Sequence, residues 1–203
     1  MNYTKPWHAL NIDVSNAVRS DFNFDNFFNS SKYANGPAGV WNFRDFEIDQ
    51  LLNTEWINAM HLQGIMVQSA MVFYREPQYI HPEAHIDTRH NGTTCISAIN
   101  WTLDPEDDSE MVWYYIPQIA PRNDVTPADT KYQSWHLSDI DPYQFASTTI
   151  GTIPTLVRTG IPHNVIMHSR PRWAVSVRYI DQHLDDWPAT VDFFKPWIKN
   201  VDC

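Results

Sequence analysis

Short runs of β-type residues, each closed by a turn signal, occupy most of the chain between residues 65 and 180. These runs are rich in β-branched and aromatic side chains, which favour strands, and glycine, proline or acidic residues separate them. The runs are residues 65–74, 85–88, 93–103, 111–116, 155–160, 163–167 and 172–180. Many short strands at this spacing predict a mainly β fold, either a β-sandwich or a jelly-roll. An α/β nucleotide-binding fold is not expected, because the sequence has no glycine-rich phosphate loop.

The segments before residue 65 predict an arm followed by one helix. Residues 1–44 read as an irregular extension whose phenylalanines pin it to the core, namely Phe22, Phe24, Phe27 and Phe28. Residues 46–60 place apolar side chains at helical spacing, which predicts one amphipathic helix. Gly64 is the expected end of this helix.

The remaining segments complete a single domain over residues 1–203. Residues 104–109 (DPEDDS) read as a solvated acidic turn, and residues 117–148 as a long excursion that covers substrate together with the arm. Residues 181–203 form a tail, either a final helix or a packed coil. We therefore expect an arm and helix (1–64) packed on a core (65–180), with the tail beside them.

Composition limits the partners of this chain. Its 14 basic and 24 acidic residues give a net charge of -10, which disfavours binding to nucleic acid or to an anionic membrane surface. The two cysteines, Cys95 and Cys203, form neither a disulfide framework nor a thiolate metal site. No signal-peptide core or membrane-length apolar run is evident, so a cytoplasmic location is expected.

The run at residues 85–88 carries an imidazole and a carboxylate two residues apart, His85 and Asp87. In a strand, residues i and i+2 point to the same face, so both side chains can hold one metal ion. Two histidines and one carboxylate make up the facial triad of non-heme Fe(II), and this pair supplies two of those three ligands.

His163 is the best candidate for the third ligand. It opens the strand candidate 163–167 directly after the turn Gly160-Ile161-Pro162, so it lies at a strand mouth, where a side chain can reach into a cavity. His81 is an alternative to His85 if the strand register differs, although it lacks a carboxylate two residues on.

The last strand candidate has two different faces. Arg172, Ala174, Ser176 and Arg178 share one face, and larger apolar side chains share the other. Two arginines and a serine on one face are typical of a pocket wall that binds a carboxylate, because arginine can donate two parallel hydrogen bonds to it. An exposed edge strand would give the same pattern, and the strand pattern alone favours neither interpretation.

Taken together, His85-x-Asp87, the distant His163, and then Arg172 and Ser176 resemble the Fe(II)- and 2-oxoglutarate-dependent dioxygenases. The aspartyl/asparaginyl hydroxylase-like and phage-type members are the most similar in pattern. The resemblance covers roughly residues 65–180. It implies a double-stranded β-helix (a cupin-like jelly-roll) with an N-terminal arm and at least one flanking helix.

The resemblance also implies the roles of the site residues. His85, Asp87 and His163 would bind Fe(II), and Arg172 would pair with the distal carboxylate of the cosubstrate 2-oxoglutarate, assisted by Ser176. Arg178 would be either this anchor or a substrate contact. Asn100, on the strand after the motif, would either touch the cosubstrate or make a structural hydrogen bond, and the structural role is the commoner one for such an amide. The implied activity is hydroxylation of a small molecule or peptide side chain, with release of succinate and CO2.

Two other functions fit parts of the same pattern. A cupin-type metalloenzyme without 2-oxoglutarate would use the same ligands but has no need of an inward arginine. A non-catalytic β-sandwich binding protein would carry the histidines and the aspartate incidentally. Zinc also suits two histidines and an aspartate, and the arginine is the reason to prefer iron with a dicarboxylate. The sequence does not define the oligomeric state.

Overall fold

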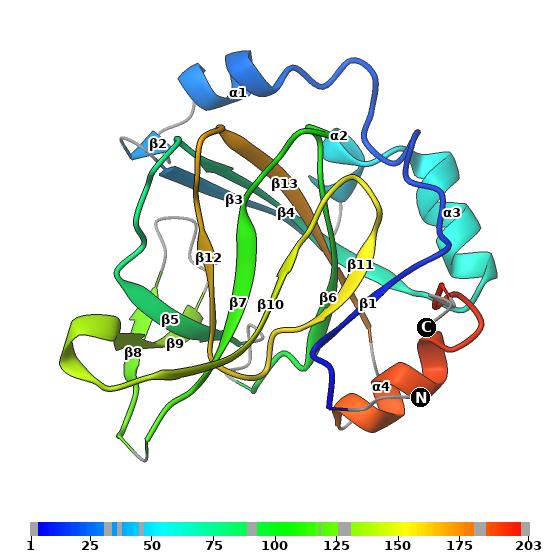
Figure 1. Ribbon diagram of the computed structural model, residues 1–203. Helices are drawn as coiled ribbons and strands as arrows, with labels where there is room; N and C mark the ends of the chain where they lie inside the picture. Colours follow the sequence, from blue (N-terminus) through cyan, green and yellow to red (C-terminus); the bar gives the residue numbers. More distant parts are fainter. Residues whose placement is uncertain are drawn as a thin grey trace.

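The fold is mainly β, with two antiparallel sheets facing each other (Figure 1). The structure is a computed structural model and describes residues 4–30, 34–35, 38–44, 47–88, 93–117, 119–125, 131–180 and 186–199. Within these residues one sheet has the strand order β1-β11-β6-β13-β4-β3-β2 and the other the order β10-β7-β12-β5-β9-β8.

The strands that the sequence predicts between residues 65 and 180 are all present. They are β4 (Val67–Arg75), β5 (Glu83–Asp87), β6 (Ser97–Thr102), β7 (Glu110–Tyr115), β11 (Thr155–Arg158), β12 (His163–Ile166) and β13 (Arg172–Tyr179). Burial does not alternate along these strands, because both faces of the larger sheet are covered: every residue of β6 except Asn100 is buried. The side chains still alternate between two environments, since Val175 and Val177 belong to the main core whereas Arg172 and Ser176 line a cavity between the sheets.

The predicted single helix over residues 46–60 is wrong, because two helices occupy this stretch. They are α2 (Ile48–Leu51) and α3 (Thr54–Leu62). Leu52 and Asn53 are extended between them, and the Asn53 side chain accepts a hydrogen bond from the backbone of Glu55, which starts the second helix. Gly64 ends α3 with a φ of 84°, as predicted.

The N-terminal arm is less irregular than predicted. It contributes β1 (Trp7–Ala9), α1 (Phe24–Ser30), β2 (Ala34–Asn35) and β3 (Ala38–Arg44), and three of these are strands of the larger sheet. The sheet therefore extends beyond residues 65–180, because β3 pairs along nearly the whole of β4 and β1 pairs with β11.

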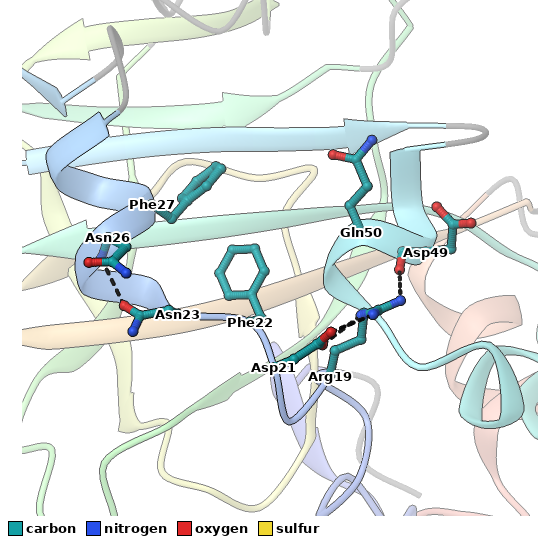
Figure 2. A pocket seen from close by; sticks show the side chains of 8 residues that line it. All are labelled: Arg19, Asp21, Phe22, Asn23, Asn26, Phe27, Asp49 and Gln50. Atoms are coloured by element: carbon teal, nitrogen blue, oxygen red, sulfur yellow. Dashed lines mark hydrogen bonds and ion pairs between the residues drawn. The ribbon is translucent and has the colours of Figure 1, made fainter.

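Aromatic and backbone contacts hold the arm in place, as its phenylalanines predict. Phe27 and Phe28 pack against Trp41, and Phe24 against Trp173. Figure 2 shows Arg19 pairing with Asp21 and donating to the backbone carbonyl of Asp49 in α2, at 3.2 Å.

The excursion at 117–148 is largely regular structure. It forms β8 (Arg122–Val125), β9 (Lys131–His136) and β10 (Tyr143–Thr149), all strands of the smaller sheet. The β8–β9 hairpin lies along β5, and β10 pairs with β7. The tail contains α4 (Trp187–Phe194), whose first turn is capped by Asp186. Cys203 lies outside the described residues.

The main hydrophobic core lies on the outer face of the larger sheet, under the arm and helices. Side chains from α2, α3 and α4 meet the outward side chains of β4, β6 and β13 there. Between the two sheets a smaller apolar cluster contains Ala98, Met111, Trp113, Ile150 and Val157. The space beside this cluster is polar, and it holds the predicted site residues. None of the helices in the described parts of the chain is both long and apolar enough to cross a membrane.

Candidate metal centre

His85 and His163 face each other across two paired strands of the smaller sheet. They are direct partners in the antiparallel pairing of β5 with β12, and their ring centroids lie 4.4 Å apart. Asp87 follows two residues along β5, and its Oδ1 is 3.7 Å from Nε2 of His85. One potential ligand atom from each of the three residues lies within 4.8 Å of the other two. The structure thus brings together the three residues that the sequence singled out as metal ligands.

Backbone hydrogen bonds tie the turn before His163 to β5 and β7. Gly160 is close to the backbone there, because a Cβ at this position would lie 3.2 Å from the carbonyl oxygen of Cys95. The carbonyl of Thr159 accepts a hydrogen bond from the backbone of Asp87, and the carbonyl of Pro162 accepts one from Tyr114. These contacts fix His163 relative to Asp87.

Both imidazoles are neutral near pH 7. Burial, helped by the neighbouring His163 and His81, holds the pKa of His85 well below its usual value. Burial also lowers the pKa of His163, against the opposing pull of Asp87. Nδ1 of His163 lies 2.9 Å from the carbonyl of Ile161, which can only accept, so Nδ1 carries the proton and Nε2 has the free lone pair. Neutral imidazoles and a carboxylate are the protonation states that metal binding requires.

The wall facing this group is the inward side of β13. Arg172, Ala174, Ser176 and Arg178 all line a cavity of about 40 Å³ that also borders His85, Asp87 and His163. β13 lies between β6 and β4 in the sheet, so the alternative of an exposed edge strand is wrong. Asn100 on β6 is the direct partner of Ser176 and lines the same cavity.

The cavity wall is rich in buried polar atoms that have no hydrogen-bond partner within the described residues. Five lining residues carry such atoms: Nδ1 of His85, Oδ1 of Asn100, Nε of Arg172, Oγ of Ser176 and Nη1 of Arg178. Buried polar groups are nearly always satisfied in folded proteins. A cluster of unsatisfied ones around one cavity is typical of a site that is completed by a bound group.

The two arginines of β13 have different partners. The guanidinium of Arg178 pairs with Oδ2 of Asp87, the proposed metal ligand. Burial disfavours its charge, but the attraction of Asp87 prevails and raises the pKa of Arg178. Nε of Arg172 lies 3.4 Å from Oδ2 of Asp107, and both side chains are buried. The prediction of a solvated acidic turn at 104–109 is therefore wrong for Asp107.

Sequence reasoning missed Arg75 as well as Asp107. Arg75 ends β4, is the direct cross-strand partner of Arg172, and lines the cavity with only 8% of its surface exposed. The alternation from Phe73 places Arg75 on the inward face, one residue beyond the strand predicted over residues 65–74. Asp107 carries no periodic signal, because it lies in a loop.

Other histidines and arginines near the motifs lie outside the group. His81 precedes β5, and its Nδ1 lies 3.1 Å from the backbone carbonyl of Glu83, so it does not replace His85. His168 is partly exposed beside Glu110, and Arg170 pairs with Asp104 and Glu106 at the surface.

A larger hollow, of about 630 Å³, lies on the surface between the arm and α2 (Figure 2). Its guanidinium, Arg19, is exposed and already pairs with Asp21 through two nitrogens. This hollow is therefore a weaker candidate than the buried cavity.

No protein-family model matches this chain, and no curated protein matches its sequence. The assignment of the site consequently depends on its geometry and chemistry.

Proposed function

We propose that this protein is an Fe(II)- and 2-oxoglutarate-dependent oxygenase that hydroxylates a small molecule or a peptide side chain. The observation that carries the proposal is the group of His85, Asp87 and His163 facing inward arginines across one cavity. Two neutral imidazoles and one carboxylate suit Fe(II), and a guanidinium opposite them suits the far end of a dicarboxylate.

We also infer that the strands form a double-stranded β-helix. In such a jelly-roll, eight strands in two four-stranded antiparallel sheets build two Greek keys. The order β11-β6-β13-β4 in one sheet and β10-β7-β12-β5 in the other supports this inference. Consecutive strands then alternate between the sheets, except from β7 to β10, which stay in one sheet. β1, β2, β3, β8 and β9 are additions at the edges.

The residues present fit a bound Fe(II). His163 offers Nε2, because its Nδ1 is hydrogen-bonded to Ile161, and such a bond orients a metal-binding imidazole. Asp87 offers Oδ1, because Arg178 holds Oδ2. The iron, with 2-oxoglutarate and O2 as cosubstrates, would supply the oxidising chemistry: one oxygen atom of O2 would enter succinate as 2-oxoglutarate loses CO2, and the other would enter the hydroxylated product.

We assign the cosubstrate anchor to Arg172 rather than Arg178. Arg178 is engaged by Asp87 and orients that carboxylate, so it acts on the metal end of the cavity. Arg172 lies at the opposite end of the same strand face and pairs with Asp107, which is not one of the proposed metal ligands. Ser176 and Asn100, between the two arginines, have unsatisfied oxygens that a carboxylate reaching toward Arg172 would pass. A cavity of about 40 Å³ holds an ion or one to two water molecules, so side chains must move to admit 2-oxoglutarate.

The substrate side is assigned to the open flank of His85 and Asp87. Each of these side chains is 19% exposed, which leaves the proposed metal position accessible. The β8–β9 hairpin borders this flank, because the ring of Tyr132 lies 5.8 Å from that of His85. Cys95 is a buried free thiol, in keeping with the cytoplasmic location that we propose.

The direct test is anaerobic addition of Fe(II) and 2-oxoglutarate, followed by the visible charge-transfer band of the chelate. We expect the band in the wild type and its loss in Asp87→Ala and His163→Ala. His168→Ala is the matched control, because this histidine is partly exposed outside the group. A wild type without the band, or a band that survives both ligand substitutions, would reject the proposal.

The same samples separate the other two functions. A cupin-type metalloenzyme would bind a divalent metal through these residues, with no effect of 2-oxoglutarate on its spectrum or affinity. A non-catalytic binding protein would show neither tight metal binding nor a response to the cosubstrate.

A further inference from the structure

We propose that Arg75, Arg172 and Asp107 form a buried subsite for one carboxylate group, in which Asp107 limits the accepted charge to one. If the subsite selects a cosubstrate, its role depends on the proposed function. Its ability to bind a carboxylate does not depend on that function, because none of its residues is a proposed metal ligand. It lies at the Arg172 end of β13, whereas Arg178 marks the other end.

Two guanidiniums meet at this end of the cavity. Arg75 and Arg172 are direct partners on β4 and β13, and they are only 8% and 4% exposed. Like charges directly opposite each other on paired strands destabilise a sheet, and burial adds to the cost. An arrangement of this kind is stable only if negative charge lies close by.

In the described part of the chain, Arg172 has a carboxylate partner and Arg75 has none. Asp107 lies 3.4 Å from Nε of Arg172, while Arg75 donates from Nη1 to the carbonyl of Val165 at 3.1 Å. Within the described residues no carboxylate lies at ion-pair distance from Arg75. Burial and the charge of Arg172 lower the pKa of Arg75 to about 10, so it remains charged at neutral pH. One positive charge is therefore uncompensated.

Asp107 is a fixed part of this end. Its side chain is fully buried, and its oxygens accept hydrogen bonds from the backbone and the hydroxyl of Ser109, at 2.9 and 3.2 Å. The same loop is clamped to the start of β13, because Asp108 accepts from the backbone of Ser169 and Glu106 pairs with Arg170. Asp107 is therefore already fixed in position when an anion binds.

The net charge of the three side chains determines which ligand the subsite prefers. A group with one negative charge neutralises the surplus charge of Arg75, because Arg172 is already paired with Asp107. A neutral group would leave a buried positive charge, and a doubly charged group would leave a buried negative one, each of which is unfavourable. The subsite accordingly favours a carboxylate over an amide and over a phosphate monoester.

The first test uses the wild-type protein without metal, kept in EDTA at pH 8, and titrates three probes by NMR. Butanoate carries one charge, butanamide none, and propyl phosphate nearly two at this pH. We expect butanoate to bind at least tenfold more tightly than either of the others. Equal affinities, or tightest binding of propyl phosphate, would overturn the proposal.

The second test rebalances the charges. Arg75→Met is expected to weaken butanoate binding at least tenfold, and the double variant Arg75→Met/Asp107→Asn to restore it to within about threefold of wild type. A merely structural role of Arg75 predicts no such rescue. The double variant also avoids the lone Asp107→Asn change, which would break a buried ion pair and threaten folding.

Arg170→Met is the control for the loss of a nearby arginine, because Arg170 pairs with the same loop from the surface. We expect its butanoate affinity to stay within twofold of wild type. A double variant no better than Arg75→Met, or an equal loss in Arg170→Met, would contradict the subsite. If the Fe(II)–2-oxoglutarate band is absent but butanoate is still bound selectively, the oxygenase proposal is rejected and the subsite stands. If the band is present but butanoate is not bound selectively, the subsite is rejected and the oxygenase proposal stands.

Discussion

At the scale of single residues, Asp87 connects the two halves of the site. Its Oδ1 faces His85 on the same strand, and its Oδ2 pairs with Arg178 from the opposite sheet. Groups that orient a metal ligand typically contribute 10- to 100-fold to metal affinity. The two arginines of β13 should therefore differ in what their removal affects.

We predict that Arg178→Met weakens Mn(II) binding about 10- to 100-fold, because Asp87 loses the partner that orients it. Arg172→Met should leave Mn(II) binding within about twofold and weaken 2-oxoglutarate binding more than tenfold, because it removes a charged anchor. Electron paramagnetic resonance titration of Mn(II), with and without 2-oxoglutarate, measures both. The opposite pattern would make Arg178 the anchor.

His8 supplies a residue-scale prediction outside the site. It is 7% exposed and stacks on Trp187, and burial, helped by the charge of Lys5, lowers its pKa to about 4. The unfolded chain binds this proton near pH 6.5, before the folded protein does. The free energy of unfolding should therefore fall as pH drops from 6.5 toward 4, by at most about 3 kcal/mol from this group.

Replacing His8 with Phe should reduce that pH dependence, since the ring stack is retained and the titrating group is lost. Urea unfolding at pH 7 and pH 5 measures the change. The difference in unfolding free energy between the two pH values should be smaller in His8→Phe than in wild type. An unchanged difference would show that His8 titrates normally in the folded protein.

At the scale of elements, β13 separates stability from binding by its two faces. Ser176 points into the cavity with an unsatisfied hydroxyl, and its neighbour Val177 is fully buried in the main core. Adjacent positions on one strand thus belong to different environments, as the alternation of residues 172–179 predicts.

We predict opposite outcomes for alanine at these two positions. Val177→Ala should lower the free energy of unfolding by about 2 kcal/mol, because it opens a cavity in the core, and should leave 2-oxoglutarate binding unchanged. Ser176→Ala should leave stability nearly unchanged and weaken 2-oxoglutarate binding about three- to tenfold, through one lost hydrogen bond. Denaturant unfolding and ligand titration test both, and a stability loss in Ser176→Ala would contradict this division.

The elements were predictable where a local pattern encodes them. Alternation predicted the strands between residues 65 and 180 and the inward face of β13, and the His85-x-Asp87 spacing predicted that these two side chains lie together on one face. The register between β4 and β13 has no local signal, so Arg75 could not be placed opposite Arg172. Asp107 is buried because it pairs with Arg172, which is distant in the sequence. Composition alone indicates a solvated acidic run at this segment.

The same limit applies to the irregular parts. The break between α2 and α3 depends on the Asn53 cap, which competes with a continuous helical pattern. The strand character of β3 depends on pairing along β4, and the order of β8, β9 and β10 on pairing with β5 and β7. Pairing with distant strands determines the conformation of these segments, and their own sequences indicate that conformation only weakly.

At the scale of the whole molecule, the proposed ligands would connect the two sheets. The proposed metal ligands lie on β5 and β12 of the smaller sheet, and the arginines proposed as anchors lie on β4 and β13 of the larger one. A cosubstrate held at both ends would bridge the cavity, so binding at one end should favour binding at the other.

We therefore predict that Mn(II) and 2-oxoglutarate together raise the melting temperature by more than the sum of their separate effects. Saturation at about 100 times Kd stabilises a protein by about 2.7 kcal/mol, which corresponds to roughly 5–10 °C for a chain of this size. Differential scanning fluorimetry measures it, with Asp87→Ala as the variant in which the combined effect should disappear. Purely additive shifts would argue against a shared site.

The most direct measurement of the central claim is a crystal structure of the protein with Mn(II) and 2-oxoglutarate, grown without oxygen. We expect Mn(II) bound by His85, Asp87 and His163, and the distal carboxylate of 2-oxoglutarate between Arg75 and Arg172. A metal bound elsewhere, or a cavity that excludes 2-oxoglutarate while the metal is bound, would contradict the account.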